Sequence, residues 1–269
     1  MADCFAGDGG GGFVKTTRIY TCEDSLEGIL SAVHAAYMSR YGHGYQSLEV
    51  GTSMNLSLFS DVIPVVTDME KAMRVADAVI HKISAFAWHW VKYGAMSCHM
   101  DKGDIIYKFL VKGFRTGPEI TEYLADPVVN RLMKLSREVS RETDHMYGFL
   151  RFRELKNGVL FATIAPKHHQ IPLIAGHFSD RFPMENWMIY DEYRHEVCVH
   201  EAGKDWFLAD SVTADPGVSS RVSDSQRLFE ERLKGFYETI GIRERENPKC
   251  RRNMMPKMYW KNMPEMTGK

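Results

Sequence analysis

Apolar residues in the first half of the chain recur at helical spacing. The apolar positions of 26–37 repeat every three to four residues, which is typical of a helix with one buried stripe. Asp24 or Ser25 precedes this segment, and either side chain can accept a hydrogen bond from the first N–H groups of a helix. A second, longer pattern begins after Asp68 and ends before Gly94. The sequence therefore predicts two helices in this region, the first of them capped by Asp24 or Ser25.

Shorter signals complete the first half. Residues 18–22 alternate between polar and apolar, as a short strand does, whereas the glycine-containing polar stretch at 42–51 is predicted to be a loop. Further helices are predicted at about 102–114, 118–125 and 127–142, the last two because a proline suits the first helical turn.

The second half alternates with the period of strands. Two strands are predicted within 147–155 and 159–166, joined by an Asn-Gly turn that favours a tight hairpin. A helix at about 168–182 follows, and the three apolar stretches beyond it are typical of short strands: 186–194, 195–203 and 205–212. Helices at about 224–240 and 255–262 close the chain. The predicted fold class is α+β, with a helical N-terminal half and a small, mostly antiparallel sheet flanked by helices.

The predicted domain organisation is simple. Residues 1–16 are rich in glycine and are expected to form a flexible tail. Residues 17–265 are expected to form a single α+β domain, with a helical part at 17–144, a sheet-containing part at 145–242 and a basic C-terminal segment at 243–265.

Composition narrows the class of protein. The chain has 269 residues, of which 44% are hydrophobic, so it can bury a sizeable core. Its five cysteines are scattered without a Cys-x-x-Cys pair, which favours a reduced, cytoplasmic protein over a disulfide-bonded one. No apolar run approaches the roughly 20 residues that a membrane span needs, so no membrane contact is expected.

The net charge of −1 hides a strong division along the sequence. By region it is −4 for residues 1–130, +4 for 131–183, −6 for 184–242 and +5 for 243–269. The total alone argues against a protein that coats nucleic acid. The division shows that two basic segments remain available for a local contact.

One basic feature is a stripe on the predicted helix at 127–142. Helical geometry places four cations within about 120° of one another, namely Arg131, Lys134, Arg137 and Arg141. Such a stripe suits a row of phosphates, because each neutralised phosphate releases counterions. A solvated face remains an alternative, in which Glu138 and Glu142 pair with neighbouring cations.

The basic C-terminal segment combines cations with aromatic residues. Cations beside aromatic rings are typical of surfaces that follow a nucleic-acid backbone and stack on bases. The candidate nucleic-acid- or anion-binding residues here are Arg245, Lys249, Arg251, Arg252, Lys257, Tyr259, Trp260 and Lys261. Docking of this segment on the acidic 184–242 region is the alternative, and the two are compatible.

Three residues are candidates for acid–base chemistry: His145, His177 and Asp191. His177 lies four residues before Arg181, so the two share a helix face on which they could hold a phosphate or carboxylate. Asp191 and Arg194 form a possible ion pair. A role for these groups in buried hydrogen bonds is the alternative to catalysis.

Arg151 and Arg153 are the best functional candidates of the predicted sheet. They alternate along one strand and so share one of its faces. Two buried guanidinium groups must meet carboxylates or an anionic ligand, because an unpaired buried charge is costly.

No standard catalytic or cofactor signature is present. The sequence lacks phosphate-cradling, dinucleotide and nucleophile-elbow motifs, and its adjacent His168 and His169 point to different sides of a helix or strand. No metal site and no cofactor are therefore expected.

Two stretches, 145–194 and 236–265, resemble a bacterial domain-of-unknown-function family associated with DNA repair and DNA metabolism. The most specific part is the pattern "NPKCRRNMMPKMYWK" at 247–261, in which Arg251 stands where members usually show glutamine. The segment at 68–84 also fits. The resemblance implies a gene neighbour of the radical SAM class that modifies or repairs DNA, and relatives fused to a uracil-DNA-glycosylase-like domain. It supplies no established catalytic residues.

Three hypotheses follow. The first is a DNA-binding accessory or partner of a base-modifying, radical SAM-type repair enzyme. The second is an enzyme that itself acts on a nucleobase or a glycosidic bond. The third is a protein–protein scaffold without direct DNA contact.

Overall fold

The computed structural model describes residues 16–51, 60–210, 222–240 and 247–266. The predicted N-terminal tail lies, apart from its last residue, outside this part of the chain. The described residues form two compact units, one with residues through Ala95 and His99–Ser136, the other with Met96–Cys98 and the residues from Arg137 onward. Each unit is described by itself.

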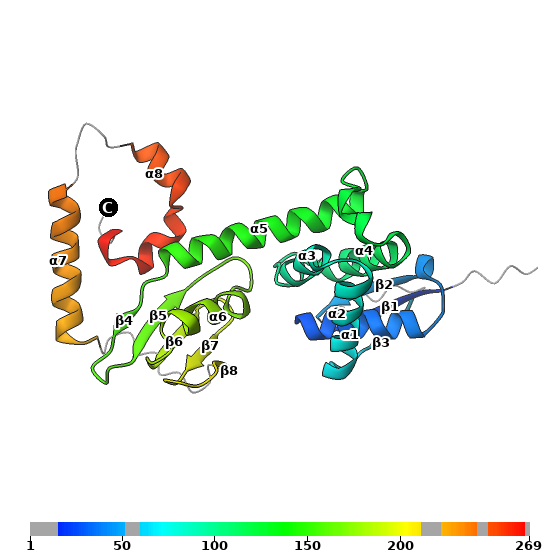
Figure 1. Cartoon of the computed structure of the whole chain (residues 1–269), viewed down its shortest axis with the longest axis horizontal. Coiled ribbons are helices and arrows are strands. Elements are labelled where there is room, and N and C mark those ends of the chain that lie inside the picture. The colour runs from blue at the N-terminus through cyan, green and yellow to red at the C-terminus, as the bar shows by residue number, and fades with distance from the viewer. Residues whose placement is uncertain (1–15, 52–59, 211–221, 241–246, 267–269) are drawn as a thin grey trace, which may run out of the picture. The chain divides into compact units, whose positions relative to one another are not determined.

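The first unit is built on a parallel three-stranded sheet (Figure 1). Its strands are β1 (Thr17–Cys22), β2 (Gln46–Val50) and β3 (Ser60–Pro64), in the order β2-β1-β3. The prediction of a loop across residues 42–51 is therefore wrong for β2, which a 3₁₀ turn at His43–Tyr45 precedes. Five residues between glycines carry little periodic signal, and pairing with β1 over Arg18–Cys22 decides their conformation.

Helices cover this sheet. Helix α1 (Leu26–Met38) is capped by Ser25, whose side chain accepts a hydrogen bond from the Gly28 N–H, and α2 (Met69–Lys82) is capped by Asp68 in the same way. The apolar pattern beyond Asp68 forms two helices rather than one. Ser84 begins α3 (Ala85–Ala95) by accepting from the Ala87 N–H, which interrupts the pattern.

The predicted helix at 102–114 is confirmed as α4 (Lys102–Thr116), whereas the one at 118–125 is a 3₁₀ turn at Pro118–Glu122. Helix α5 (Pro127–Phe149) is longer than predicted and contributes residues to both units. The strand expected within 147–155 is consequently reduced to β4 (Arg153–Glu154).

The second unit holds a mixed five-stranded sheet in the order β4-β5-β6-β7-β8. Its other strands are β5 (Leu160–Ile164), β6 (Trp187–Asp191), β7 (Glu196–His200) and β8 (Phe207–Asp210). β5 and β6 are parallel because α6 (Ile171–Arg181) crosses between them, and the remaining pairs are antiparallel. The α+β class is confirmed. The expectation of one mostly antiparallel sheet is wrong, since one sheet is parallel and the other mixed.

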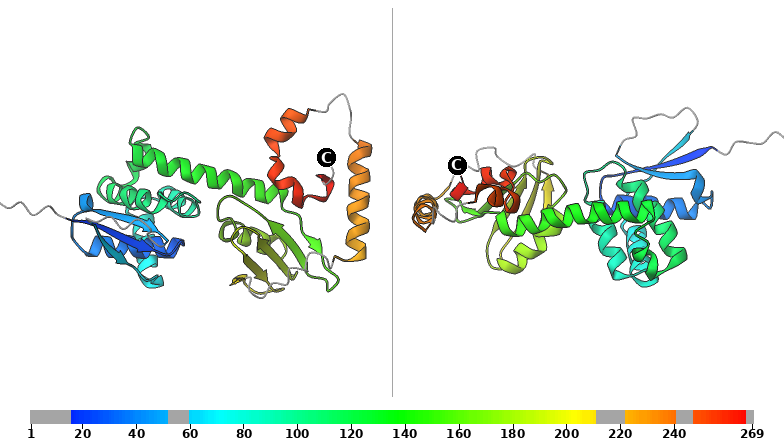
Figure 2. Two further views of the ribbon diagram at one scale, coloured as in Figure 1. Left: turned by 180° about the vertical axis from the view of Figure 1, so that it is seen from behind. Right: turned by 90° about the horizontal axis from the view of Figure 1, so that it is seen from above.

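Helix α6 lies against the sheet of this unit (Figure 2). Ile174 and Phe178 of α6 pack with Trp187 and Ile189 of β6, all of them buried. The chain continues with α7 (Asp224–Ile240), α8 (Pro248–Met254) and two 3₁₀ turns, η6 (Lys257–Asn262) and η7 (Pro264–Met266). None of the helices in the described ranges is long and apolar enough to cross a membrane.

Candidate functional site

The turn that follows β6 is held from within by Asp191. Its side chain is 0% exposed, and its Oδ1 accepts hydrogen bonds from the backbone N–H groups of Tyr193 at 2.9 Å and Arg194 at 3.3 Å. Its Oδ2 accepts from Arg194 Nη1 at 3.0 Å. The ion pair predicted for Asp191 and Arg194 is confirmed. These contacts agree with the alternative to the predicted acid–base role, in which Asp191 takes part in buried hydrogen bonds.

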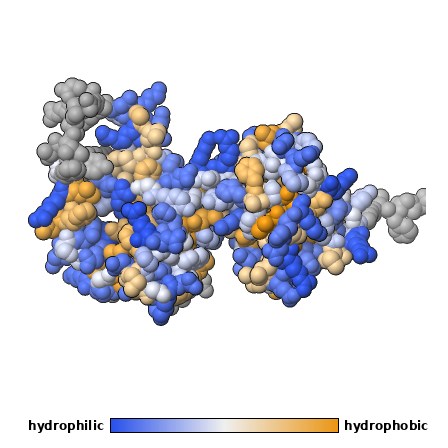
Figure 3. Space-filling model, in the orientation of Figure 1, coloured by the Kyte–Doolittle hydropathy of each residue, from blue (hydrophilic) through white to orange (hydrophobic). Residues whose placement is uncertain are grey.

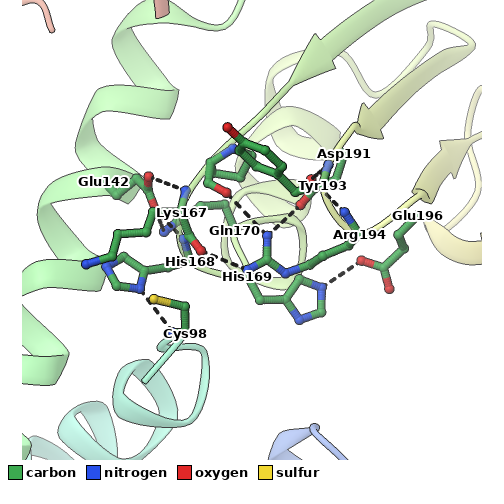
Figure 4. Close-up of polar contacts among 11 residues, drawn as sticks. Cys98, Glu142, Lys167, His168, His169, Gln170, Asp191, Tyr193, Arg194 and Glu196 are labelled. Atoms are coloured by element: carbon green, nitrogen blue, oxygen red, sulfur yellow. Dashed lines mark hydrogen bonds and ion pairs between the residues drawn. The ribbon is translucent and has the colours of Figure 1, made fainter. Parts of the chain in front are cut away.

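Arg194 joins this turn to the loop before α6. Besides Asp191, its guanidinium donates to the carbonyl of Lys167 at 3.0 Å and to that of Pro166 at 3.4 Å. The loop 165–170 and the turn 192–194 are therefore fixed to each other through one side chain (Figure 4).

Glu142 of α5 fixes the same loop from its other side. Its two carboxylate oxygens accept from the backbone N–H groups of Lys167 and His168, each at 2.7 Å, and Oε2 also accepts from Gln170 Nε2 at 3.1 Å. Gln170 in turn accepts from the Thr143 hydroxyl at 2.7 Å. Glu142 is buried and points into the unit, so the expected surface pairing with neighbouring cations is wrong.

The two histidines of this loop point to different partners, as predicted. His168 is buried, and its Nδ1 accepts from the backbone N–H of Cys98 at 3.2 Å. His169 Nε2 donates to Glu196 of β7 at 2.6 Å. The polar run "PKHHQ" at 166–170 is the sequence signal that could have revealed this network, although its partner Glu142 lies far away in the sequence.

The two arginines of the predicted strand meet carboxylates. Arg151 lies before β4 and donates to Oε1 of Glu265, a side chain only 2% exposed, at 2.8 and 3.0 Å. Arg153 donates to both oxygens of Glu230, at 2.6 and 3.0 Å. Burial acts to raise the pKa of Glu230, but hydrogen bonds from Arg153 and Gln226 outweigh it and hold the pKa below its ordinary value. These arginines fasten α7 and η7 to the sheet.

The histidines predicted for catalysis pack against aromatic rings. His145 lies 5.6 Å from the Phe149 ring and 5.5 Å from the Tyr259 ring, and the exposed His177 lies 4.3 Å from Tyr147. Within the described ranges, no hydrogen bond, ion pair or ring contact joins any two of His145, His177 and Asp191. Arg181 is exposed at the end of α6, with its guanidinium 5.7 Å from the Phe182 ring.

Part of the basic C-terminal segment is docked. The Tyr259 ring is half-buried against His145 and Phe149, and burial raises the pKa of its hydroxyl, with a further increase from the Glu142 carboxylate. The Trp260 indole N–H donates to the Met255 carbonyl at 3.0 Å. Lys261 pairs with Glu192 of the acidic 184–242 region. Tyr259 therefore anchors the segment, and these contacts cover part of its ring; stacking by Tyr259 or Trp260 stays a prediction.

The remaining cations of this segment point outward. Lys249 and Arg252 of α8 and Lys257 of η6 are exposed, and none of them forms an ion pair with a described residue. Arg251 likewise has no such pair, and Arg245 lies outside the described residues. Both views of Figure 2 place α8 and η6 beside the end of α5 that carries Phe149. Figure 3 shows hydrophilic residues with apolar ones among them over α8.

Of the four cations in the predicted stripe on α5, one is paired with a described carboxylate and three are not. Arg131 donates to both oxygens of Asp101, at 2.8 and 3.0 Å. Lys134, Arg137 and Arg141 are exposed and form no ion pair with a described residue. No group of three or more His, Cys, Asp or Glu side chains in the described ranges is arranged to hold a metal ion.

Comparison with known proteins identifies a family. Residues 100–265, more than half of the chain, match the DUF4130 domain, a domain of unknown function. The chain belongs to the DUF4130 family. In this DUF4130 protein the matched region contains α5, the whole mixed sheet and the C-terminal segment, and thus every candidate site residue described above.

Other comparisons add little to this assignment. No curated protein sequence matches the chain. Among solved structures, a chain described as a DHH domain and a member of the s1p family of ribosomal proteins is 9% identical over 84% of this chain and 79% of that chain, with a TM-score of 0.30. A likeness at this level does not establish a shared fold.

Proposed function

We propose that this DUF4130 protein binds DNA through its second unit and acts as an accessory or partner of a base-modifying, radical SAM-type DNA repair enzyme. The observation that carries the proposal is the division among the predicted cations. Arg151, Arg153, Arg194 and Lys261 are held by carboxylates. Lys249, Arg252 and Lys257 are exposed without such a partner and remain available to phosphates.

Docking of the segment supports this role. Tyr259 and Lys261 fasten η6 to the rest of the unit, so the neighbouring Lys257 is presented from a fixed support. Cations on an ordered surface lose less conformational freedom when they meet phosphates than cations on a loose chain. The link to base modification rests on the resemblance of 145–194 and 236–265 to proteins associated with DNA repair.

The test is DNA binding by a variant that removes two cations without a carboxylate partner among the described residues. Arg251→Ala combined with Arg252→Ala should weaken binding to a short labelled duplex at low salt, measured by fluorescence anisotropy. Lys204→Ala is the matched control, because Lys204 is an exposed cation paired with Glu201, and it should bind as the wild type does. Absence of DNA binding by the wild type at low salt, alone or with the radical SAM partner, would refute the proposal.

The enzyme hypothesis gains no support from the geometry. Asp191 is enclosed by its own turn, and the two candidate histidines pack on different aromatic rings. The scaffold hypothesis makes a distinct prediction, namely association with the radical SAM protein that nuclease treatment leaves unchanged and that occurs without any affinity for DNA.

A further inference from the structure

Tyr193 is the most exposed of the phenylalanine, tyrosine and tryptophan residues whose side chains the structure describes. It is 69% exposed, compared with 59% for Phe229 and 58% for Phe86. Its ring and hydroxyl make no aromatic contact or hydrogen bond with a described residue, whereas its backbone N–H is bound by Asp191. The Tyr193 ring is therefore open to solvent, while its backbone is held in place by Asp191.

Several hydrogen bonds hold the backbone of the turn that carries Tyr193. Asp191 binds two successive N–H groups of the turn, and Arg194, the residue after Tyr193, bridges to the carbonyls of the loop before α6. Figure 4 shows Tyr193 on this turn beside Asp191 and Arg194. A rigid aromatic ring offered to solvent needs no ordering of its backbone when a flat ligand stacks on it.

The turn that carries Tyr193 is joined to the basic C-terminal segment. Lys261 of η6 pairs with Glu192, the residue before Tyr193, which connects that segment to this turn. Lys167 is exposed, and its backbone carbonyl accepts a hydrogen bond from Arg194. Lys261 neutralises the charge of Glu192, so Glu192 does not repel a phosphate backbone near this turn. Proteins bind single-stranded nucleic acid with exposed aromatic rings that stack on bases, next to basic surfaces that follow the backbone.

We infer that Tyr193 stacks on an unpaired base of DNA whose backbone lies along the basic C-terminal segment. This inference rests on the proposed DNA binding and adds the class of substrate, single-stranded DNA or a duplex with an unpaired base. It also assigns the stacking role, predicted for Tyr259 or Trp260, to a residue whose ring makes no contact with a described aromatic side chain.

The experiment compares Tyr193→Ala with the wild type on a labelled oligothymidine and on a fully paired duplex. Single-strand affinity should fall about five- to 150-fold, the range for loss of one base–aromatic stack. Duplex affinity should change less than about twofold, because it depends on phosphate contacts. Tyr193→Phe should bind as the wild type does, and Phe207→Ala on β8 is the control for loss of an exposed aromatic.

An oligonucleotide with abasic sites separates stacking from charge. On this probe, Tyr193→Ala and the wild type should bind equally, because no base is present to stack. If Arg251→Ala with Arg252→Ala weakens single-strand binding while Tyr193→Ala leaves it unchanged, the inference is wrong and the proposed function stands. If the wild type binds neither the oligothymidine nor the duplex, the inference and the proposed function are both wrong.

Discussion

Substitution of Asp191 tests whether this residue is structural. Asp191→Ala removes an acceptor that is 0% exposed, leaves two backbone N–H groups without their partner and frees Arg194 from its carboxylate. Removal of one member of a buried ion pair costs about 3 to 5 kcal/mol. Arg194 is 26% exposed, so water can solvate part of its released charge. We therefore expect a loss near the lower limit, about 3 kcal/mol of unfolding free energy.

Asp191→Asn refines the same test. The amide keeps one oxygen for the N–H groups of Tyr193 and Arg194 but removes the charge that Arg194 meets, so we expect a smaller loss of about 1 to 2 kcal/mol. Asp180→Ala is the control, because Asp180 is an exposed acid of the same unit that forms no ion pair with a described residue. It should change stability by less than about 0.5 kcal/mol.

The assay combines urea denaturation with hydrogen exchange. Tryptophan fluorescence reports on this unit through the buried Trp187, and exchange of the Tyr193 and Arg194 amides reports on the turn itself. Two compact units can unfold separately, so the amide measurement isolates the local effect. If Asp191→Ala costs less than about 1 kcal/mol and both amides stay protected, the assignment of Asp191 as the support of this turn is refuted.

Two further predictions concern titratable groups. Glu230→Gln should destabilise the protein by about 1 kcal/mol at neutral pH, since its partner Arg153 is partly screened by solvent. Because the folded pKa of Glu230 lies below its ordinary value of 4.5, this contribution is present above that pH and should vanish as the pH falls through the folded pKa. Urea denaturation at successively lower pH would show the loss, and a difference between Glu230→Gln and the wild type that stays constant would contradict the assignment. Burial raises the pKa of Cys198 to about 12, with a smaller increase from Glu196, so this thiol should resist alkylation in the native protein while the exposed Cys98 and Cys250 react, as mass spectrometry would show. Rapid native labelling of Cys198 would contradict that prediction.

The sequence predicted elements that carry their own local signal. Ser25, one of two candidates, caps α1, and a helix begins after Asp68 as expected. The hairpin turn contains Gly158 at φ +79°, a conformation that suits glycine. β2 and β3 were missed because short strands of a parallel sheet depend on partners distant in the sequence. The same reason explains the site, since Glu142 reaches a loop 25 residues away and no local pattern indicates that contact.

For the candidate site residues too, the sequence shows which residues are present but not which partners they meet. The presence of arginines at 151 and 153 is a sequence property, but their carboxylates come from Glu265 and Glu230, which lie 114 and 77 residues away. Tyr193 falls near the end of a stretch predicted to be a strand, and nothing in that pattern marked it as a binding residue. Its importance follows only from the exposure of its ring and from the contacts that fix its backbone.

The salt dependence of DNA binding tests the central claim most directly. If the exposed cations of α8 and η6 contact phosphates, the logarithm of the association constant should fall linearly with the logarithm of salt between about 50 and 200 mM. Arg252→Ala should reduce the magnitude of that slope by about 1, whereas Lys204→Ala should leave it unchanged. A slope that Arg252→Ala does not alter, or no DNA affinity at low salt, would contradict the account.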